Sequence, residues 1–246
     1  MPDPLAIVEI LDRSEQGTTR PFLCRCDDER LYFVKGRGAG HRGLLSEWLT
    51  GHLAKAFGLP VPEFAVAHAP QGLVDLHPEG RDLGWTPLFA SQRAAFAQDL
   101  TVSQRNSVLT ALRRDVLVFD WWVRNGDRTL TALGGNPNLL WVAGDRGLVV
   151  IDHNLAFDLE FDAAQFAENH AFSDQIPFVF QDLVEPLGYA ARFQRALAVW
   201  PDACNNAPKA WWFVDEEQTV PTDFDPVAAL AMLNRCTTQE FWRLTP

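Results

Sequence analysis

Five side chains of this sequence occur in an order and a mixture of types that suit one kind of chemistry. They are Lys35, Glu47, Asp127, Asn138 and Asp152. Phosphoryl transfer needs a cation on the phosphates of ATP, oxygen ligands that hold Mg²⁺, and a carboxylate that orients the acceptor hydroxyl and accepts its proton. The five residues supply each of these groups. The sequence therefore predicts a phosphoryl-transfer site that uses ATP and Mg²⁺.

The first two of these residues lie on neighbouring predicted elements. Lys35 ends the strand-like run LYFVK, and Glu47 is the first acidic residue inside the helical pattern that follows. The order lysine, glutamate, aspartate, asparagine, aspartate is that of protein kinases, in which the glutamate pairs with the lysine and positions it. The other interpretation is that both charges are simply solvent-exposed, as most lysines and glutamates are.

Asn138 and Asp152 flank a predicted hairpin. The strand-like runs NLLWVA and LVVID are separated by the turn GDRG. If Gly144 and Gly147 close this turn, position 138 lies opposite position 153, and Asn138 and Asp152 meet at the open end of the hairpin. Mg²⁺ demands oxygen ligands in a nearly fixed geometry, which a rigid hairpin provides. The alternative is that the two residues only begin and end strands.

Two aspartates compete for the catalytic position. Asp127 lies in NGDRT, just after a long helical run, whereas Asp120 lies inside that run and has the D-x4-N spacing with Asn125. Asn125 precedes Asp152 by 27 residues (152 − 125), but Asn138 precedes it by 14 (152 − 138), which is enough for one hairpin. We therefore favour Asp127 as the catalytic residue and interpret Asp120 as a buried structural carboxylate.

The elements that must position these residues form a β-rich part and a helical part. Residues 5–35 are typical of a three-stranded antiparallel meander, and residues 61–69 are typical of a further strand. Between them, a glycine-rich stretch leads into one helix, whose apolar positions follow helical spacing: Leu45, Trp48, Leu49, Leu53 and Ala56.

The second part is predicted to be mainly helical. Residues 70–90 have the composition of a loop, and a strong helical pattern follows over 102–122. The last helix is indicated by Asp225 as N-cap and Pro226 at the first helical position. We predict an α+β, two-lobed, protein-kinase-like fold. Residues 1–85 form a small, mainly antiparallel β N-lobe with one helix, and residues 86–246 form a mainly helical C-lobe.

Bulk properties exclude several other classes. The net charge of −11 and the pI near 4.9 argue against a general binder of nucleic acid or of anionic membranes. No 18-residue apolar run indicates a membrane span, and the N-terminus lacks the features of a signal peptide. We interpret the four cysteines as reduced, and expect a cytoplasmic protein.

Other site motifs are weak. GAGHRG satisfies the G-x-G-x-x-G pattern of dinucleotide-binding folds, but no acidic residue ends the next predicted strand and no βαβα alternation follows. The six histidines show no metal-ligand spacing, and no G-x-S-x-G motif indicates a hydrolase. These observations leave the kinase interpretation as the best supported.

Several segments together resemble one family, the HipA-like kinases. They are SEQGTTRPFLCRC…YFVK, LLSEWLTGHLAKAFGLPVPE and FDWWVRNGDRT…GGNPNLLW…VVIDHNLAF, which span roughly residues 5–160. The resemblance implies that Lys35 contacts ATP phosphates, that Glu47 pairs with it, and that Asp127 is the catalytic base. It implies Mg²⁺ ligands at Asp152 and at Asn138 or Asn136. It also implies a phosphate-binding loop at Gly17, Thr18 and Thr19.

The resemblance further implies a serine/threonine kinase that acts on a protein, and a possible antitoxin-like partner. This chain departs from the family in two ways: the spacing between Asp127 and Asn138 exceeds D-x4-N, and the phosphate loop holds a single glycine, Gly17. The longer spacing motivates an alternative, a pseudokinase that binds nucleotide as a regulatory module. A third interpretation keeps the fold and makes a small molecule the acceptor.

Overall fold

A computed structural model describes residues 3–15, 19–85, 87–142, 147–180 and 185–244. The chain forms two compact units, each made of several segments. Unit 1 comprises residues 1–48, 62–93 and 205–224, and unit 2 comprises residues 49–61, 94–204 and 225–246. The lobe boundary expected after residue 85 remains a prediction. The two units are each made of several chain segments, so they do not test a single boundary between two lobes.

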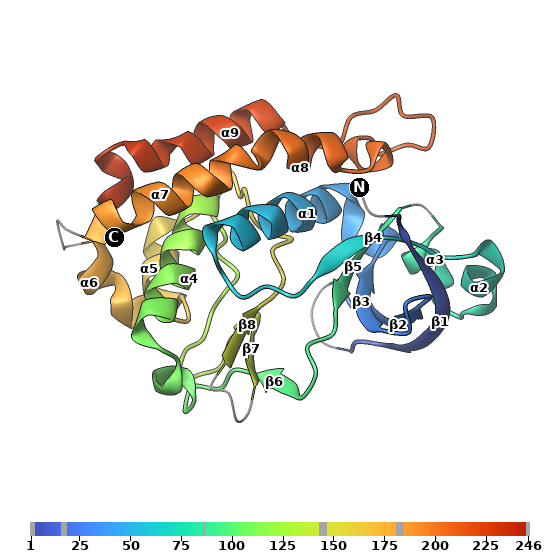
Figure 1. The fold of residues 1–246 in the computed structure, drawn as a ribbon, viewed down its shortest axis with the longest axis horizontal. Coiled ribbons are helices and arrows are strands. Elements are labelled where there is room, and N and C mark those ends of the chain that lie inside the picture. Colours follow the sequence, from blue (N-terminus) through green and yellow to red (C-terminus); the bar gives the residue numbers. More distant parts are fainter. Residues whose placement is uncertain (1–2, 16–18, 86, 143–146, 181–184, 245–246) are drawn as a thin grey trace. The chain divides into compact units, whose positions relative to one another are not determined.

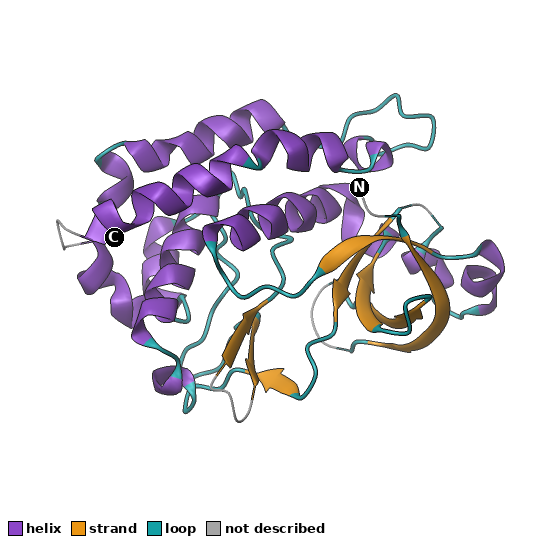
Figure 2. Ribbon diagram, in the orientation of Figure 1, coloured by secondary structure: helices purple, strands orange, loops and turns teal. Residues whose placement is uncertain are grey.

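Five strands of unit 1 form a closed barrel, in the order β1-β2-β3-β5-β4 (Figures 1 and 2). Neighbouring strands are antiparallel except β1 and β4, which are parallel and close the barrel. The meander expected over residues 5–35 is confirmed as the first three strands. The strand bounds are β1 (Leu5–Arg13), β2 (Phe22–Cys26), β3 (Leu31–Lys35), β4 (Phe64–His68) and β5 (Leu88–Gln92).

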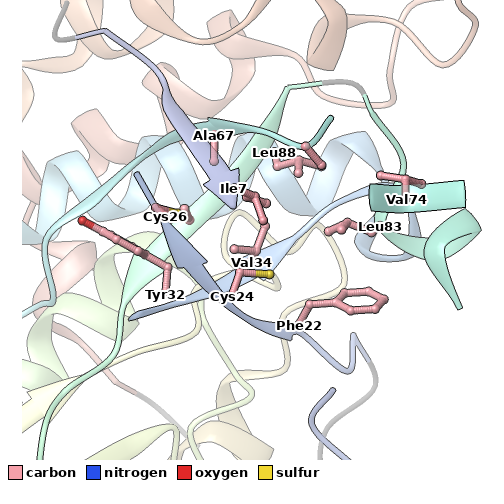
Figure 3. Packing of buried hydrophobic residues seen from close by; sticks show 12 residues of the cluster. Ile7, Phe22, Cys24, Cys26, Tyr32, Val34, Ala67, Val74, Leu83 and Leu88 are labelled. Carbon is pink, nitrogen blue, oxygen red and sulfur yellow. The ribbon is translucent and has the colours of Figure 1, made fainter. Parts of the chain in front are cut away.

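The barrel interior is apolar because alternate residues of each strand point inward. Phe22, Cys24 and Cys26 of β2 are buried, as are Tyr32 and Val34 of β3. Figure 3 shows these side chains gathered around Ile7. Burial raises the pKa of Cys24 to about 12, which keeps this free cysteine protonated.

The segment 70–90, expected to be a loop, is instead largely structured, so the prediction of a single helix in residues 1–85 is wrong. It contains α2 (Gln71–Leu76), α3 (Gly80–Leu83) and the start of β5. The helix that the sequence did predict is α1 (Gly40–Phe57), which follows the 3₁₀ helix η1 (Arg37–Ala39). Gly36, after β3, permits the close approach of α3, since a Cβ there would lie 1.9 Å from the Leu83 carbonyl oxygen.

Unit 2 is mainly helical and also holds a three-stranded sheet in the order β6-β7-β8. Its helix α4 (Thr110–Val123) begins later than the run expected over 102–122 and ends one residue beyond it, and Asp225 caps α9 as predicted. The other bounds are β6 (Ala97–Asp99), β7 (Leu139–Val142), β8 (Gly147–Val150), α5 (Ala163–Asn169), α6 (Ile176–Phe180), α7 (Glu185–Ala198), α8 (Trp200–Asn206) and α9 (Pro226–Asn234). Short 3₁₀ helices are η2 (Arg105–Ser107), η3 (Ser173–Gln175), η4 (Lys209–Trp212), η5 (Arg235–Thr237) and η6 (Glu240–Trp242).

The core of unit 2 is built around α4 from aromatic rings. Phe119 and Trp122 pack against Phe57, and Trp122 packs against Phe193 with ring centroids 4.9 Å apart. The indole nitrogen of Trp122 donates to the Leu233 carbonyl at 2.8 Å, so this buried polar atom is satisfied. None of the described helices combines the length and apolar character needed to cross a bilayer.

Candidate active site

In unit 1, Lys35 and Glu47 form the expected ion pair. Lys35 is the last residue of β3 and follows the inward-pointing Val34, so its side chain leaves the strand on the face opposite the barrel core. Glu47 lies in α1, and its Oε1 accepts a hydrogen bond from Lys35 Nζ. Lys35 is only 8% exposed and Glu47 only 3%. Exposure of both charges, the other sequence interpretation, is therefore wrong.

In unit 2, Asp127 lies four residues beyond the end of α4. The helix ends with Arg124 in a left-handed conformation (φ 52°), which turns the chain into the loop. Asp127 Oδ2 accepts two hydrogen bonds, from Asn136 Nδ2 at 2.8 Å and from Asn138 Nδ2 at 2.9 Å. Both asparagines considered from the sequence are thus held by the same carboxylate oxygen.

A small hairpin explains how the long spacing after Asp127 still brings the asparagines back. Thr129 N–H donates to the Asn136 carbonyl, and Thr131 and Gly134 exchange backbone hydrogen bonds. Gly135 (φ 156°) is needed at its base, because a Cβ there would lie 2.5 Å from the Thr129 carbonyl oxygen. The extra residues therefore fold onto themselves and leave Asn136 beside Asp127.

Asn138 and Asp152 lie at the open end of the β7–β8 hairpin, as expected, but the predicted register is wrong by two residues. Leu139 pairs with Val150, and Ile151 N–H donates to the Asn138 carbonyl at 3.1 Å, so position 138 lies opposite 151 and not 153. The turn that would decide the register, around Gly144, lies outside the described residues. Asn138 and Asp152 both have positive φ (47° and 56°), which Asn and Asp tolerate better than most residues.

The two carboxylates of this loop influence each other. Burial raises the pKa of Asp127, the hydrogen bond from Asn138 lowers it, and the negative charge of Asp152 raises it again, with a net upward shift. The carboxylate of Asp152 is therefore close enough to Asp127 to matter electrostatically. A cation held by Asp152 would reverse the sign of this influence.

Arg128 joins the loop to the hairpin. Its side chain is fully buried, and Nη1 donates to the carbonyls of Asn138 and of Ile151, the latter at 3.1 Å. Its Nε donates to Asp120 Oδ2 at 2.6 Å. The arginine thus holds both chain segments at the open end of the hairpin and anchors them to α4.

Asp120 is the buried structural carboxylate that the sequence indicates. It accepts hydrogen bonds from Asn125 Nδ2 at 3.0 Å, contacts His170 Nε2 at 3.1 Å, and has no exposed surface. Burial raises its pKa, but the charge of Arg128 and the His170 hydrogen bond outweigh this and hold the pKa at about 2. Since Asp120 and Asn125 are both buried and bonded to each other, their D-x4-N spacing reflects this structural bond.

Comparison with known proteins relates this chain to kinases. A model of a family described as "HipA-like kinase" matches residues 7–245. The chain belongs to the HipA-like kinase family. The crystal structure of the proinflammatory kinase CtkA of Helicobacter pylori is similar in fold, with a TM-score of 0.52 and 12% identity over 96% of this chain and 95% of that one. No curated protein sequence matches significantly.

The residues of this HipA-like kinase fit a Mg²⁺ ion. An ionised Asp127 accepts hydrogen bonds only, so the amide nitrogens of Asn136 and Asn138 must face it, and their carbonyl oxygens are left for other partners. Together with the Asp152 carboxylate they form a set of hard oxygen donors. No group of three or more His, Cys, Asp or Glu in the described part of the chain has the arrangement of a metal site.

Sequence reasoning missed Arg128 and His170. Arg128 follows Asp127 directly, but an arginine in a polar loop is usually exposed. His170 is 50 residues from Asp120, and no local pattern relates the two. Of the predicted phosphate-loop residues, Gly17 and Thr18 lie outside the described residues, and Thr19 is partly buried shortly before β2.

Proposed function

We propose that this HipA-like kinase transfers the γ-phosphoryl group of ATP, with Mg²⁺, to a serine or threonine hydroxyl of a protein. The observation that carries the proposal is the Asp127 carboxylate, bonded to Asn136 and Asn138 beside Asp152. A carboxylate held in this way is prepared to orient a hydroxyl, and its neighbours supply the oxygens that a metal–nucleotide complex requires.

In the proposed reaction, the acceptor hydroxyl oxygen attacks the γ-phosphorus. The bond from that phosphorus to the β–γ bridging oxygen breaks, ADP leaves, and the hydroxyl proton moves to Asp127. Hydrogen bonds from Asn136 and Asn138 engage only Oδ2, so Oδ1 is the oxygen for the acceptor proton. The raised pKa of Asp127 favours its role as proton acceptor.

Lys35 would bind the ATP phosphates, with Glu47 fixing its position through the buried ion pair. Asp152 with Asn138 or Asn136 would hold Mg²⁺, which when bound neutralises the phosphate charge that grows during transfer. Gly17, Thr18 and Thr19 would line the phosphates. The protein acceptor, the cytoplasmic location and an antitoxin-like partner rest on the family resemblance.

The test is incubation with γ-labelled ATP and Mg²⁺, comparing the wild-type protein with the Asp127→Ala and Asp152→Ala variants. We expect label on the wild-type chain or on added protein, and none with either variant. Asp99→Ala is the matched control, because Asp99 is an exposed aspartate of β6 in the same unit. Nucleotide binding without any transfer by the wild type would contradict the proposal and favour the pseudokinase alternative.

A further inference from the structure

A pocket of about 370 Å³ opens directly onto the proposed catalytic aspartate, entirely within unit 2. Gly126, Asp127 and Thr129 line one side, and residues of the segment 155–169 line the other. Its volume lies within the usual range of ligand pockets. Because Asp127 lies in its wall, whatever occupies this pocket presents its groups to the proposed proton acceptor.

The pocket walls are joined by backbone hydrogen bonds, so their spacing is fixed. Leu130 N–H donates to the Asn169 carbonyl at 3.1 Å, and Ala171 N–H donates to the Arg128 carbonyl at 2.9 Å. Two of the lining residues are aromatic and pack against each other: Phe161 and Phe166, with ring centroids 5.2 Å apart. The cavity is therefore part of the folded loop structure and does not depend on a single side-chain conformation.

The lining carries four carboxylates and no basic residue among those that the structure describes. The carboxylates belong to Asp127, Asp158, Glu160 and Asp162. Arg128, the nearest arginine in sequence, has no exposed surface and is bonded to Asp120. Backbone N–H groups bind Asp158 and Asp162, the latter as N-cap of α5, but no basic side chain lines the described pocket. A concave site lined in this way attracts cations.

Exposed apolar side chains accompany these carboxylates. Leu155, which lines the pocket, is 53% exposed, and Leu159 in the same segment is 76% exposed. A small polycation would leave these leucines uncovered, whereas a polypeptide can place basic and apolar side chains at alternate positions. The combination favours a peptide segment as the occupant.

We infer that this pocket binds the acceptor as a basic polypeptide segment, with an arginine or lysine close to the phosphorylated serine or threonine. Asp158 and Glu160 are its specificity-determining residues. The inference rests on the proposed function for the identity of the acceptor hydroxyl, but the binding of basic peptide is a property of the pocket alone. The two can therefore be tested separately.

Binding is tested with labelled nine-residue peptides and the whole 246-residue chain, without nucleotide, by fluorescence anisotropy. The probe has a central serine flanked by arginines and leucines, and its controls replace each arginine by citrulline or by glutamate. We expect the arginine peptide to bind most tightly and to weaken as salt rises. The double variant Asp158→Asn/Glu160→Gln should weaken its binding about tenfold, with little change for the citrulline peptide.

Glu168→Gln is the matched control, because Glu168 is an exposed carboxylate of α5 that does not line the pocket. Asp158→Asn keeps the oxygen that accepts the Glu160 N–H, so the turn is preserved. Equal affinity for the three peptides, or equal loss in the Glu168→Gln variant, would overturn the inference. So would binding of a cationic aminoglycoside at this site without binding of the arginine peptide.

The same peptides, with γ-labelled ATP and Mg²⁺, then test the reaction. A lower KM for the arginine peptide, raised in the double variant with little change of kcat, supports the inference together with the proposed function. Transfer to all peptides with equal KM would overturn the inference and leave the kinase function intact. Arginine-dependent binding without transfer would support the pocket and contradict the proposed function.

Discussion

The two units hold their buried charges in different ways. In unit 1, one lysine and one glutamate meet between a strand and a helix, the lysine carried by the ladder-bonded strand β3. In unit 2, the charges lie at the junction of a helix, a loop and a hairpin, where Asn138 and Asp152 adopt left-handed backbone conformations. There, Arg128 donates hydrogen bonds to the main-chain carbonyls of Asn138 and Ile151, just beyond the paired residues of the β7–β8 ladder.

This difference shows where irregular backbone needs side-chain support. A strand or helix fixes a residue through its own repeating hydrogen bonds, so the residue needs less support from side chains. The loop that carries Asp127 lacks that repeat, and the buried Arg128 with Asp120 takes over the same task. The network around Arg128 should therefore be costlier to break than the pair in unit 1.

Arg128→Met should have the largest effect. It takes the arginine charge away from the buried Asp120 carboxylate, which keeps only Asn125 and His170 as neighbours, and it removes one hydrogen bond from each of two carbonyls. We expect this change to cost about 4 kcal/mol of unfolding free energy. Denaturant unfolding followed by Trp fluorescence measures this loss. Arg25→Met, at an exposed pair with Glu9, is the control and should cost less than about 1 kcal/mol. Equal losses in the two variants would contradict the comparison.

Glu47→Gln should cost somewhat less, about 3 kcal/mol, because the ion pair with Lys35 is lost while Lys35 keeps a flexible stem and 8% exposure. Adding Lys35→Met in the same chain should recover part of this loss, since both charges of the pair are then removed. The double variant should nevertheless lack phosphoryl transfer. The double-mutant cycle measures the interaction free energy between the two residues. A double variant less stable than Glu47→Gln would show that the two charges do not stabilise each other.

The charge network of unit 2 also predicts a response to acid. The pKa of Asp120 is about 2 in the folded protein against an ordinary 3.8, so its contribution is complete above 3.8 and is lost as pH falls toward 2. We expect a loss of about 2 kcal/mol over that range. Denaturant titrations across this pH range test it by comparing the wild type with Asp120→Asn, which lacks the titrating carboxylate, so that the difference between the two profiles reports Asp120. A separate loss is expected below pH 6.5, because the pKa of His170 is also lowered. A pH-independent stability would contradict the assignment.

The smallest effect is expected at Asn136. The hydrogen bond from Asn136 lowers the pKa of Asp127, so Asn136→Ala should raise that pKa further. Because the ionised carboxylate is the active form, activity is lost as pH falls through this pKa, and the midpoint of the acidic limb should move to higher pH. Leu133→Ala, at a fully exposed position of the same loop, should leave the pH–rate profile unchanged.

Local patterns predicted the meander, the start of α9 and the β7–β8 hairpin, because alternation and capping are properties of neighbouring residues. They failed where distant residues decide the structure. Strand β5 pairs with β3 and β4, and residues 205–224 belong to unit 1, although neither is indicated by the local sequence.

In the candidate site, too, some features follow from the local sequence and others depend on contacts between distant residues. Lys35, Glu47, Asp127, Asn138 and Asp152 could be chosen by type and order, since phosphoryl transfer limits which groups are useful. The register of the β7–β8 hairpin could not be predicted correctly, because it depends on the geometry of the turn, which the sequence does not determine. The roles of Arg128 and His170 arise from contacts across 8 and 50 residues of sequence, which no periodicity reveals.

The small hairpin of residues 129–136 has a practical consequence. Asn136 and Asn138 donate hydrogen bonds to Asp127, and Arg128 donates one to the Asn138 carbonyl. The outer tip of the hairpin takes no part in these bonds. The side chain of Leu133 at the tip is entirely in solvent. Insertions at this tip should therefore leave the hydrogen bonds of Asp127 in place, and a fluorophore attached there could report acceptor docking at the proposed site.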